Sequence, residues 1–306
     1  MNNIDTSTIG AKIKALASDA SIEITPMSNG ETEKMIGLIN PGRRVFITYL
    51  PGTAIERTIE AARLLTIAGM NPVPHIAARS IPNIKILEST LSKLKKQSNI
   101  SEVLVIGGSV KEPVGDFHAS IQLLETDLFQ KYHIKTVGVA GHPEGSPDIS
   151  ETDIKDALKN KQRYAKNNSV DLQLVTQFIF NPHSAYEWAN HLIAQGCFLP
   201  IHLGLAGPAS ATALIKFAKM CGVRHSVDFI KRQGLRMLKL ATIELPDQAI
   251  LSIAEKVLVD PTFNLARLHF YNFGGLNRTM KFLTLLEKGE FEISDSRKKI
   301  NLATEL

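Results

Sequence analysis

The sequence contains few cysteines, no long apolar run and no strong excess of either charge. Cys197 and Cys221 are the only cysteines among 306 residues, and neither forms a CxxC pair or a cluster with histidine. This pattern argues against a disulfide-stapled scaffold and provides no cysteine ligand set for a metal. We expect both thiols to be reduced and structural, in a cytoplasmic protein.

Membrane and nucleic-acid partners are disfavoured by the same kind of absence. No apolar run approaches the roughly 20 residues that span a bilayer, and the polar stretch 1–5 lacks the basic and apolar regions of an export signal. The net charge is +5, and the short basic stretches 93–96 and 297–299 have no interleaved aromatics. We therefore expect neither a membrane span nor a nucleic-acid partner. The mild positive charge would suit an anionic small molecule, although solubility explains it more simply.

Apolar, β-branched runs alternate with helix-period segments along most of the chain. The predicted strands are 22–25, 45–49, 73–77, 103–106, 136–140, 172–180, 198–205 and 268–273. The predicted helices are 9–17, 54–68, 84–95, 117–129, 154–165, 183–194 and 209–219. Most of these strands are continuously apolar, as expected for a parallel sheet that is covered on both faces.

This alternation fits an open doubly wound sheet or a closed (β/α)8 barrel. Eight strands without a GxGxxG motif after the first one favour the barrel. We predict a single α/β domain over residues 1–306, a (β/α)8 TIM barrel with a leading helix and a helical elaboration at about 226–259. In such barrels the functional site lies at the carboxyl ends of the strands, because the βα loops converge there.

The stretch 136–148 (TVGVAGHPEGSPD) begins as a buried strand and breaks at once into Gly, His, Pro and Glu. It resembles the GVAGYPEGH loop of the methylenetetrahydrofolate reductase family, with His142 and Ser146 where that family has Tyr and His. Four further stretches match in the family's order, so that the resemblance covers roughly residues 20–288: SIEITP at 21–26, PHIA at 74–77, LVTQFIF at 174–180 and LHFY at 268–271.

Glu23 lies inside an apolar strand, between Ile22 and Ile24, where a carboxylate without a partner is costly. One interpretation is a structural Glu that pairs with a Lys or Arg of a neighbouring strand. The other is a carboxyl that the dry mouth of a barrel keeps protonated, so that it can donate a proton. The resemblance implies the second, since the matching Glu of the family is the proton donor to the folate.

The resemblance also implies a set of folate contacts. Gln177 offers both a donor and an acceptor to the edge of a pterin, although a Gln that bonds backbone across the barrel is the simpler interpretation. Phe217 would stack on the folate or on a nicotinamide ring, whereas the residue alone would be assigned to the core. Arg278 follows the last predicted strand and would bind substrate.

Flavin contacts are implied at several strand ends and on one helix. Thr48 and His75 match residues that touch the flavin, although a structural His is an equal alternative for His75. Ala140, His142 and Ser146 belong to the loop of the first motif. The segment that would hold the adenosine and phosphate portion carries four polar residues, and an ordinary solvated helix would look the same: Asp156, Lys159, Gln162 and Arg163.

Three departures from the family pattern bear on function. Gly107-Gly108-Ser109 stands where the family commonly has Arg-Gly-Asp, so a carboxylate near the flavin ring is absent at Ser109. Its absence should make a bound flavin a better electron acceptor and favour the methyl-to-methylene direction. Gly107 and His142 stand where the family has Arg and Tyr, which weakens the implied flavin contacts. A loosely held flavin, or no flavin, is therefore an open alternative. Residues 273–275 (FGG) are inserted after the last predicted strand, where glycines serve a phosphate, a close backbone approach or a simple turn.

The resulting hypothesis is an FAD-dependent oxidoreductase that interconverts 5,10-methylenetetrahydrofolate and 5-methyltetrahydrofolate, with NAD(P)H as a candidate electron donor or acceptor. Two alternatives stay open. One is a flavin-free enzyme that transfers hydride directly between NAD(P)H and folate, and the other is a non-catalytic barrel that binds a partner protein. Tetrahydrofolate derivatives are the expected ligands, a homo-oligomer is compatible with the sequence, and no metal site is expected.

Overall fold

The structure is a computed structural model that describes residues 4–146, 149–168, 170–221 and 243–306. Its main sheet is a closed barrel of eight parallel strands in the order β1-β10-β7-β6-β5-β4-β3-β2, and helices alternate with the strands along the chain. The predicted fold class, a (β/α)8 barrel, is therefore confirmed. Within the described part of the chain, no helix combines the length and apolarity needed to cross a bilayer.

The chain divides into two compact units, which are described separately below. The β1–β5 unit comprises Ser21–Gly141 and Thr152–Val175, and the β7–β10 unit comprises Met1–Ala20, His142–Glu151 and Thr176–Leu306. The sixth strand, β6 (Asp171–Ile179), contributes its first half to one unit and its second half to the other.

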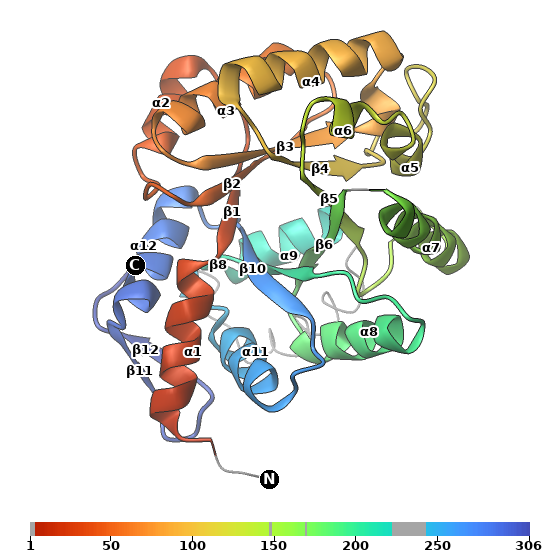
Figure 1. Cartoon of the computed structure of the whole chain (residues 1–306). Helices are drawn as coiled ribbons and strands as arrows, with labels where there is room; N and C mark the ends of the chain where they lie inside the picture. The colour runs from red at the N-terminus through yellow and green to blue at the C-terminus, as the bar shows by residue number, and fades with distance from the viewer. Residues whose placement is uncertain (1–3, 147–148, 169, 222–242) are drawn as a thin grey trace. The chain divides into compact units, whose positions relative to one another are not determined.

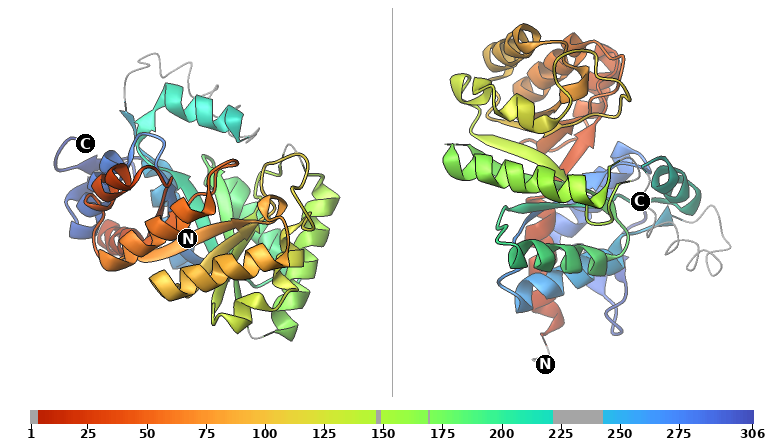
Figure 2. Two further views of the ribbon diagram at one scale, coloured as in Figure 1. Left: turned by 90° about the horizontal axis from the view of Figure 1, so that it is seen from above. Right: turned by 90° about the vertical axis from the view of Figure 1, so that its right-hand side faces the viewer.

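The β1–β5 unit contains five complete strands in parallel register. These strands are β1 (Ser21–Ile24), β2 (Arg44–Ile47), β3 (Asn71–Ala77), β4 (Glu102–Ile106) and β5 (Thr136–Gly141). Its helices are α2 (Asn29–Ile36), α3 (Ile55–Ile67), α4 (Ile84–Ser98), α5 (Ser120–Leu124), α6 (Leu128–Lys131) and α7 (Glu151–Asn167), with a short 3-10 helix, η1, at Ala78–Ser80. Figures 1 and 2 show α3 and α4 lying side by side.

The β7–β10 unit contains the remaining strands and helices. Its two barrel strands are β7 (Ile201–Ala206) and β10 (Leu265–Tyr271), and its helices are α1 (Thr6–Ser18), α8 (Pro182–Ala194), α9 (Ala211–Met220), α11 (Asp247–Val259) and α12 (Leu276–Lys288). Two small antiparallel pairs complete it, β8 (Ala209–Ser210) with β9 (Ile243–Glu244) and β11 (Phe291–Ile293) with β12 (Ile300–Leu302). In Figure 1, α1 runs alongside α11 and α12.

Local signals explain several helix starts. The Asp5 side chain accepts a hydrogen bond from the Thr8 N–H at 2.8 Å and caps α1, and Asn83 caps α4 in the same way through the Ile86 N–H. Helix α8 begins with Pro182 directly after the capping residue Asn181, a position where the missing proline N–H costs no hydrogen bond.

Some predicted boundaries were wrong. The segment 117–129 forms two short helices, α5 and α6, because Asp127 adopts a left-handed conformation with φ of 57° that a continuous helix cannot accommodate. The strand predicted from residue 198 begins at Ile201, and Phe198 is 66% exposed. Of the helical elaboration predicted at 226–259, residues 226–242 lie outside the described residues and the remainder contains α11.

Candidate functional site

Glu23 and His75 lie together near the carboxyl ends of β1 and β3. Glu23 pairs in register with Phe46 of β2, and Phe46 pairs with Val73 of β3, so Glu23, Phe46 and His75 share one face of the sheet. His75 Nε2 lies 4.0 Å from Glu23 Oε2, and the His75 ring meets the Phe46 ring edge-on at a centroid distance of 5.9 Å.

The surroundings of this pair are largely dry. The side chains of His75 and Glu23 are only 9% and 19% exposed, and Phe46, Val73, Leu104 and Val175 form an apolar cluster on that same face. At 4.0 Å the two groups are close, but they are too far apart for a direct hydrogen bond. The structure therefore brings the predicted proton donor beside one of the predicted flavin contacts.

Thr48 follows β2 and holds a buried hydroxyl at the same ends of the strands. The Thr48 N–H donates to the Ile24 carbonyl at 2.8 Å, which fixes the backbone. Its Oγ1 is buried, and no described residue hydrogen-bonds to it. A buried hydroxyl without a partner loses hydrogen-bonding energy unless a ligand supplies the partner, so Thr48 fits the contact that the resemblance implies.

The segment after β4 lies against the end of β3. A Cβ on Gly108, which has φ of 94°, would stand 3.2 Å from the Ala77 Cβ, so the two segments are in close contact. Ser109 comes next and is exposed. Ser109, which stands where the family commonly has an aspartate, is thus an exposed residue just after β4.

The four polar residues predicted on the helix after β5 lie on α7. Asp156, Lys159 and Arg163 are exposed and Gln162 is half-buried, which places three of the four in solvent. Sequence reasoning missed Lys161 on the same helix. Its side chain is buried, and the loss of hydration lowers its pKa from 10.5 to about 8. No signal in the polar sequence of α7 distinguishes Lys161 from its exposed neighbours.

The loop after β5 starts at the half-buried Ala140 and continues through residues that belong to the β7–β10 unit. The His142 carbonyl accepts a hydrogen bond from the Gly145 N–H at 3.2 Å, which forms a turn. Glu144 Oε1 accepts a bond from the Ser184 hydroxyl at 3.3 Å. His142 and Ser146 are both half-buried. The motif is therefore a turn held against the start of α8.

Gln177 lies on β6 within the β7–β10 unit. Its Oε1 accepts a hydrogen bond from the Phe178 N–H at 3.1 Å, a bond to the next residue of the same strand rather than across the barrel. No described residue accepts a hydrogen bond from its Nε2, so the amide donors are available to a ligand. The neighbouring Thr176 hydroxyl accepts a bond from the Gly204 N–H at 2.8 Å, and the Thr176 carbonyl accepts one from the Tyr271 hydroxyl at 2.9 Å.

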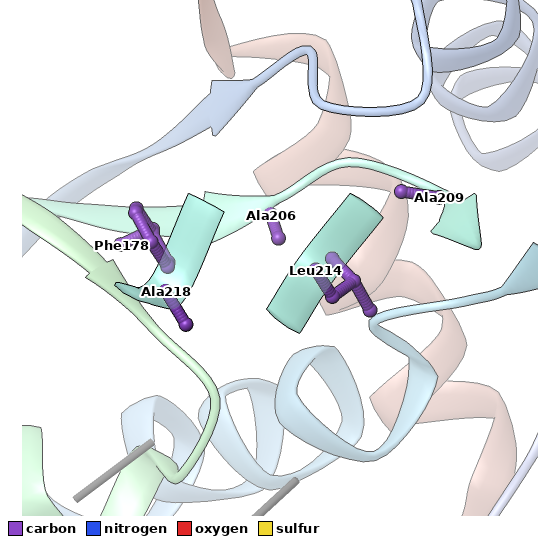
Figure 3. Packing of buried hydrophobic residues seen from close by; sticks show 5 residues of the cluster. All are labelled: Phe178, Ala206, Ala209, Leu214 and Ala218. Carbon is purple, nitrogen blue, oxygen red and sulfur yellow. The ribbon is translucent and has the colours of Figure 1, made fainter. Parts of the chain in front are cut away.

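Phe217 belongs to a column of aromatic rings. It stacks on Phe273 with a centroid distance of 4.1 Å and an interplanar angle of 12°, and Phe273 in turn stacks on Tyr271 at 5.7 Å. Phe178, fully buried, meets Phe273 edge-on at 4.7 Å. Figure 3 shows Phe178 beside Ala218 of α9, in the cluster against which Phe217 packs. One face of Phe217 is therefore covered by a residue of the inserted segment.

Gly274, the first of the two glycines in that insertion, lies close to the backbone of Pro208. A Cβ on Gly274 would stand 1.9 Å from the Pro208 carbonyl oxygen, so only glycine fits there. Arg278, in the first turn of α12, donates to the Gly274 carbonyl at 2.6 Å, and its buried Nε has no partner among the described residues. Arg278 thus braces the insertion and retains a donor for a ligand.

The described part of the chain contains no group of three or more His, Cys, Asp or Glu residues that could hold a metal ion. The fold and these residues define a class, the (β/α)8 barrel proteins that gather polar side chains at the carboxyl ends of their strands. The family model of methylenetetrahydrofolate reductase matches residues 33–288. The chain belongs to that family.

Two solved structures align with this chain at low sequence identity. A protein from Clostridium thermocellum that binds two copies of 5-methyl-5,6,7,8-tetrahydrofolic acid superposes with a TM-score of 0.54 and 13% identity, covering 92% of this chain and 98% of that chain. The DHPS of Yersinia pestis, solved with a pterine-sulfa conjugate, aligns with a TM-score of 0.45 and 13% identity over 89% of this chain and 94% of that chain. The first of these likenesses shows a shared fold.

Proposed function

We propose that this protein is an FAD-dependent oxidoreductase that interconverts 5,10-methylenetetrahydrofolate and 5-methyltetrahydrofolate. Family membership supports the reaction class. The observation that carries the proposal is the placement of Glu23 Oε2 4.0 Å from His75 Nε2, on a largely dry face near the carboxyl ends of β1 and β3. A barrel that served only to bind a partner would not need a carboxyl in that place.

Glu23 acts as the general acid and base. A carboxyl that is held in a dry site can give a proton to a substrate nitrogen in one direction and accept it in the other. His75 acts as a positioning residue, because its ring packs edge-on against Phe46 and keeps its Nε2 facing the carboxyl. The pair therefore supplies a proton at a fixed place.

The β1–β5 unit also has groups that fit a flavin. The buried Thr48 hydroxyl has no hydrogen-bond partner among the described residues, and the exposed Lys159 and Arg163 of α7 offer positive charge to a diphosphate. When bound, the flavin would supply hydride transfer, which no amino-acid side chain can perform. The protein's own contribution is to hold the ring, exclude water and handle the proton.

The β7–β10 unit contains the residues that we assign to the folate. The Gln177 amide donors have no acceptor among the described residues, and a pterin edge presents the acceptors they require. Phe217, held flat against Phe273, contributes an aromatic surface, and Arg278 retains a buried Nε that can donate to a carboxylate.

The direction we favour is from methyl to methylene. With Ser109 in place of a carboxylate, no negative charge from this position opposes the uptake of electrons by the flavin. NAD(P)H or its oxidised form is the proposed electron partner.

The absorbance spectrum tests the proposal most directly. Purified protein, incubated with FAD and freed of excess cofactor, should show the bands of oxidised flavin. Anaerobic addition of 5-methyltetrahydrofolate should bleach those bands. Protein that takes up no FAD but oxidises NADPH with 5,10-methylenetetrahydrofolate would instead support the flavin-free alternative, and protein that does neither would contradict an oxidoreductase role.

A further inference from the structure

The strongest unassigned feature is a cation in the β1–β5 unit, Arg79. It lies in η1, directly after β3, at the carboxyl end where Thr48 and His75 also stand. The sequence resemblance gives it no role. Its Nε is buried, and no described residue forms a hydrogen bond or an ion pair with its guanidinium. A buried, unpaired donor of a charged group is costly, so a structure retains it where something else supplies the acceptor.

The backbone around Arg79 is fixed on both sides. The Arg79 N–H donates to the Gly107 carbonyl at 2.9 Å, and the Arg79 carbonyl accepts from the Val114 N–H at 2.9 Å. Further along, the Asp116 N–H donates to the Pro82 carbonyl at 3.0 Å. The segment after β4 is therefore bonded to the segment after β3 on both sides of Arg79. This bracing limits how far the guanidinium can move.

Two other arginines of this unit form ion pairs with acids of the same unit. Arg44 forms an ion pair with Glu102 at 2.7 Å, and Arg63 forms one with Glu60 at 2.6 Å. The acids closest to Arg79 along the braced loop, Glu112 and Asp116, are exposed and make no ion pair with it in the described structure. The position on this loop where a carboxylate would be expected is Ser109, which carries no charge.

We infer that Arg79 is an anion-binding residue, whose guanidinium binds an anionic oxygen of a ligand at the carboxyl ends of β3 and β4. The planar fork of an arginine suits a phosphate or a carboxylate, which can accept two parallel hydrogen bonds. Both groups occur on the ligands of the proposed function, a flavin phosphate and a folate glutamate. The inference rests on that function for the choice of ligand, and the experiment separates the two sources.

The test compares Arg79→Met with Arg57→Met, which removes the same charge from the exposed face of α3 in the same unit. Dissociation constants are measured for oxidised FAD, FMN and riboflavin and for 5-methyltetrahydrofolate. A charge-assisted hydrogen bond contributes enough that its loss should weaken binding by about 10- to 100-fold. Weaker FAD and FMN with unchanged riboflavin assigns the anion to the phosphate, and weaker 5-methyltetrahydrofolate assigns it to the carboxylate.

Two outcomes overturn the inference. If Arg79→Met binds all four ligands as Arg57→Met does, Arg79 binds no anion. If riboflavin weakens as much as FAD, the effect is structural, because riboflavin has no anionic group. Arg79→Lys keeps the charge and much of the side chain, so it covers the case in which the Met variant does not fold. The ligand affinity of Arg79→Lys should fall between that of Arg79→Met and that of the wild type. Wild-type affinity of Arg79→Lys for every ligand would contradict an arginine-specific contact.

These outcomes are distinct from a failure of the proposed function. The wild-type titrations test whether the protein binds flavin and folate at all. The ratio of the dissociation constants of the variant and the wild type tests the role of Arg79. Wild-type binding without a change in the variants therefore leaves the proposed function standing and removes only the role of Arg79.

Discussion

The two units present different chemistry at the residues that we assign to function. In the β1–β5 unit these groups are charged or hydrogen-bonding, namely Glu23 beside His75, the Thr48 hydroxyl and the Arg79 guanidinium. In the β7–β10 unit the corresponding feature is a column of rings, with Phe273 between Phe217 and Tyr271. One unit is suited to moving protons and binding anions, and the other to holding a planar ring by its faces.

The difference also shows how such sites can be found. A lone Glu in an apolar strand is visible in sequence because its burial needs a reason. An aromatic column is not visible, because Phe273 and Phe217 are far apart in the chain and each alone is typical of a core. Substitutions in the β1–β5 unit should therefore alter proton transfer, anion binding and the reduction potential of the flavin. Substitutions in the β7–β10 unit should alter only the affinity for folate.

The largest expected effect is that of Glu23→Gln. Removing the proton donor should lower turnover about 10²- to 10⁴-fold, the usual contribution of general acid–base catalysis. FAD binding should not change, because the substitution keeps the shape of the side chain. Steady-state and single-turnover rates measure the effect, with Glu33→Gln on the exposed face of α2 as the control. Turnover like that of wild type would remove Glu23 from the mechanism.

Lys161 tests whether a buried cation of the β1–β5 unit costs stability. Burial lowers its pKa from 10.5 to about 8, a shift worth at most about 3 kcal/mol of unfolding free energy. Lys161→Met should therefore stabilise the protein at pH 7, provided that the shorter side chain fills the same space. Lys159→Met, exposed on the same helix, should not.

The stability difference between Lys161→Met and the wild type should depend on pH. Between about pH 8 and 10.5 the unfolded chain binds a proton at Lys161 that the folded chain does not, so wild-type stability rises with pH across this window. The advantage of Lys161→Met should be complete below about pH 8 and disappear towards pH 10.5. Urea midpoints over this range measure it, and an advantage independent of pH would contradict the assignment.

Ser109→Asp should lower the reduction potential of the bound flavin. At an effective dielectric constant of about 20 and a separation of about 6 Å, a fixed negative charge contributes roughly 3 kcal/mol, which water at an exposed position reduces. Oxidation of 5-methyltetrahydrofolate should slow relative to reduction of 5,10-methylenetetrahydrofolate. Potentiometric titration measures the change, with the uncharged Ser109→Asn as the matched control. An equal or higher potential would show that Ser109 does not act on the ring.

The smallest effect is expected in the β7–β10 unit. Gln177→Ala removes one neutral hydrogen-bonding side chain and should weaken 5-methyltetrahydrofolate binding about 5- to 10-fold, in line with about 1 kcal/mol for such a bond. The rate of flavin reduction by a nicotinamide donor should stay close to that of wild type. Gln195→Ala, exposed near the end of α8, serves as the control. An equal loss in folate binding and in flavin reduction would contradict the assignment of separate roles to the two units.

The architecture and the polar residues of the candidate site could be predicted before the structure was known. Eight apolar runs separated by helical segments indicate a parallel sheet that is covered on both faces, and the absence of a GxGxxG motif after the first run favours the closed barrel over the open sheet. Glu23 could be singled out as a carboxyl inside an apolar run, and the family resemblance implied flavin contacts for Thr48 and His75. The division of 117–129 into two helices could not be predicted, since it depends on one left-handed residue, Asp127.

Which of these groups lie in contact could be learned only from the folded chain. The pairing of Glu23 with His75 follows from the register of β1, β2 and β3, which no local pattern encodes. The covering of Phe217 by Phe273 depends on the close approach of Gly274 to Pro208, between residues more than sixty positions apart. The Arg79 guanidinium has no partner among the described residues, although the segment after β4 is bonded to the Arg79 backbone. Propensity and periodicity act over a few residues, whereas contacts between distant segments are set by packing.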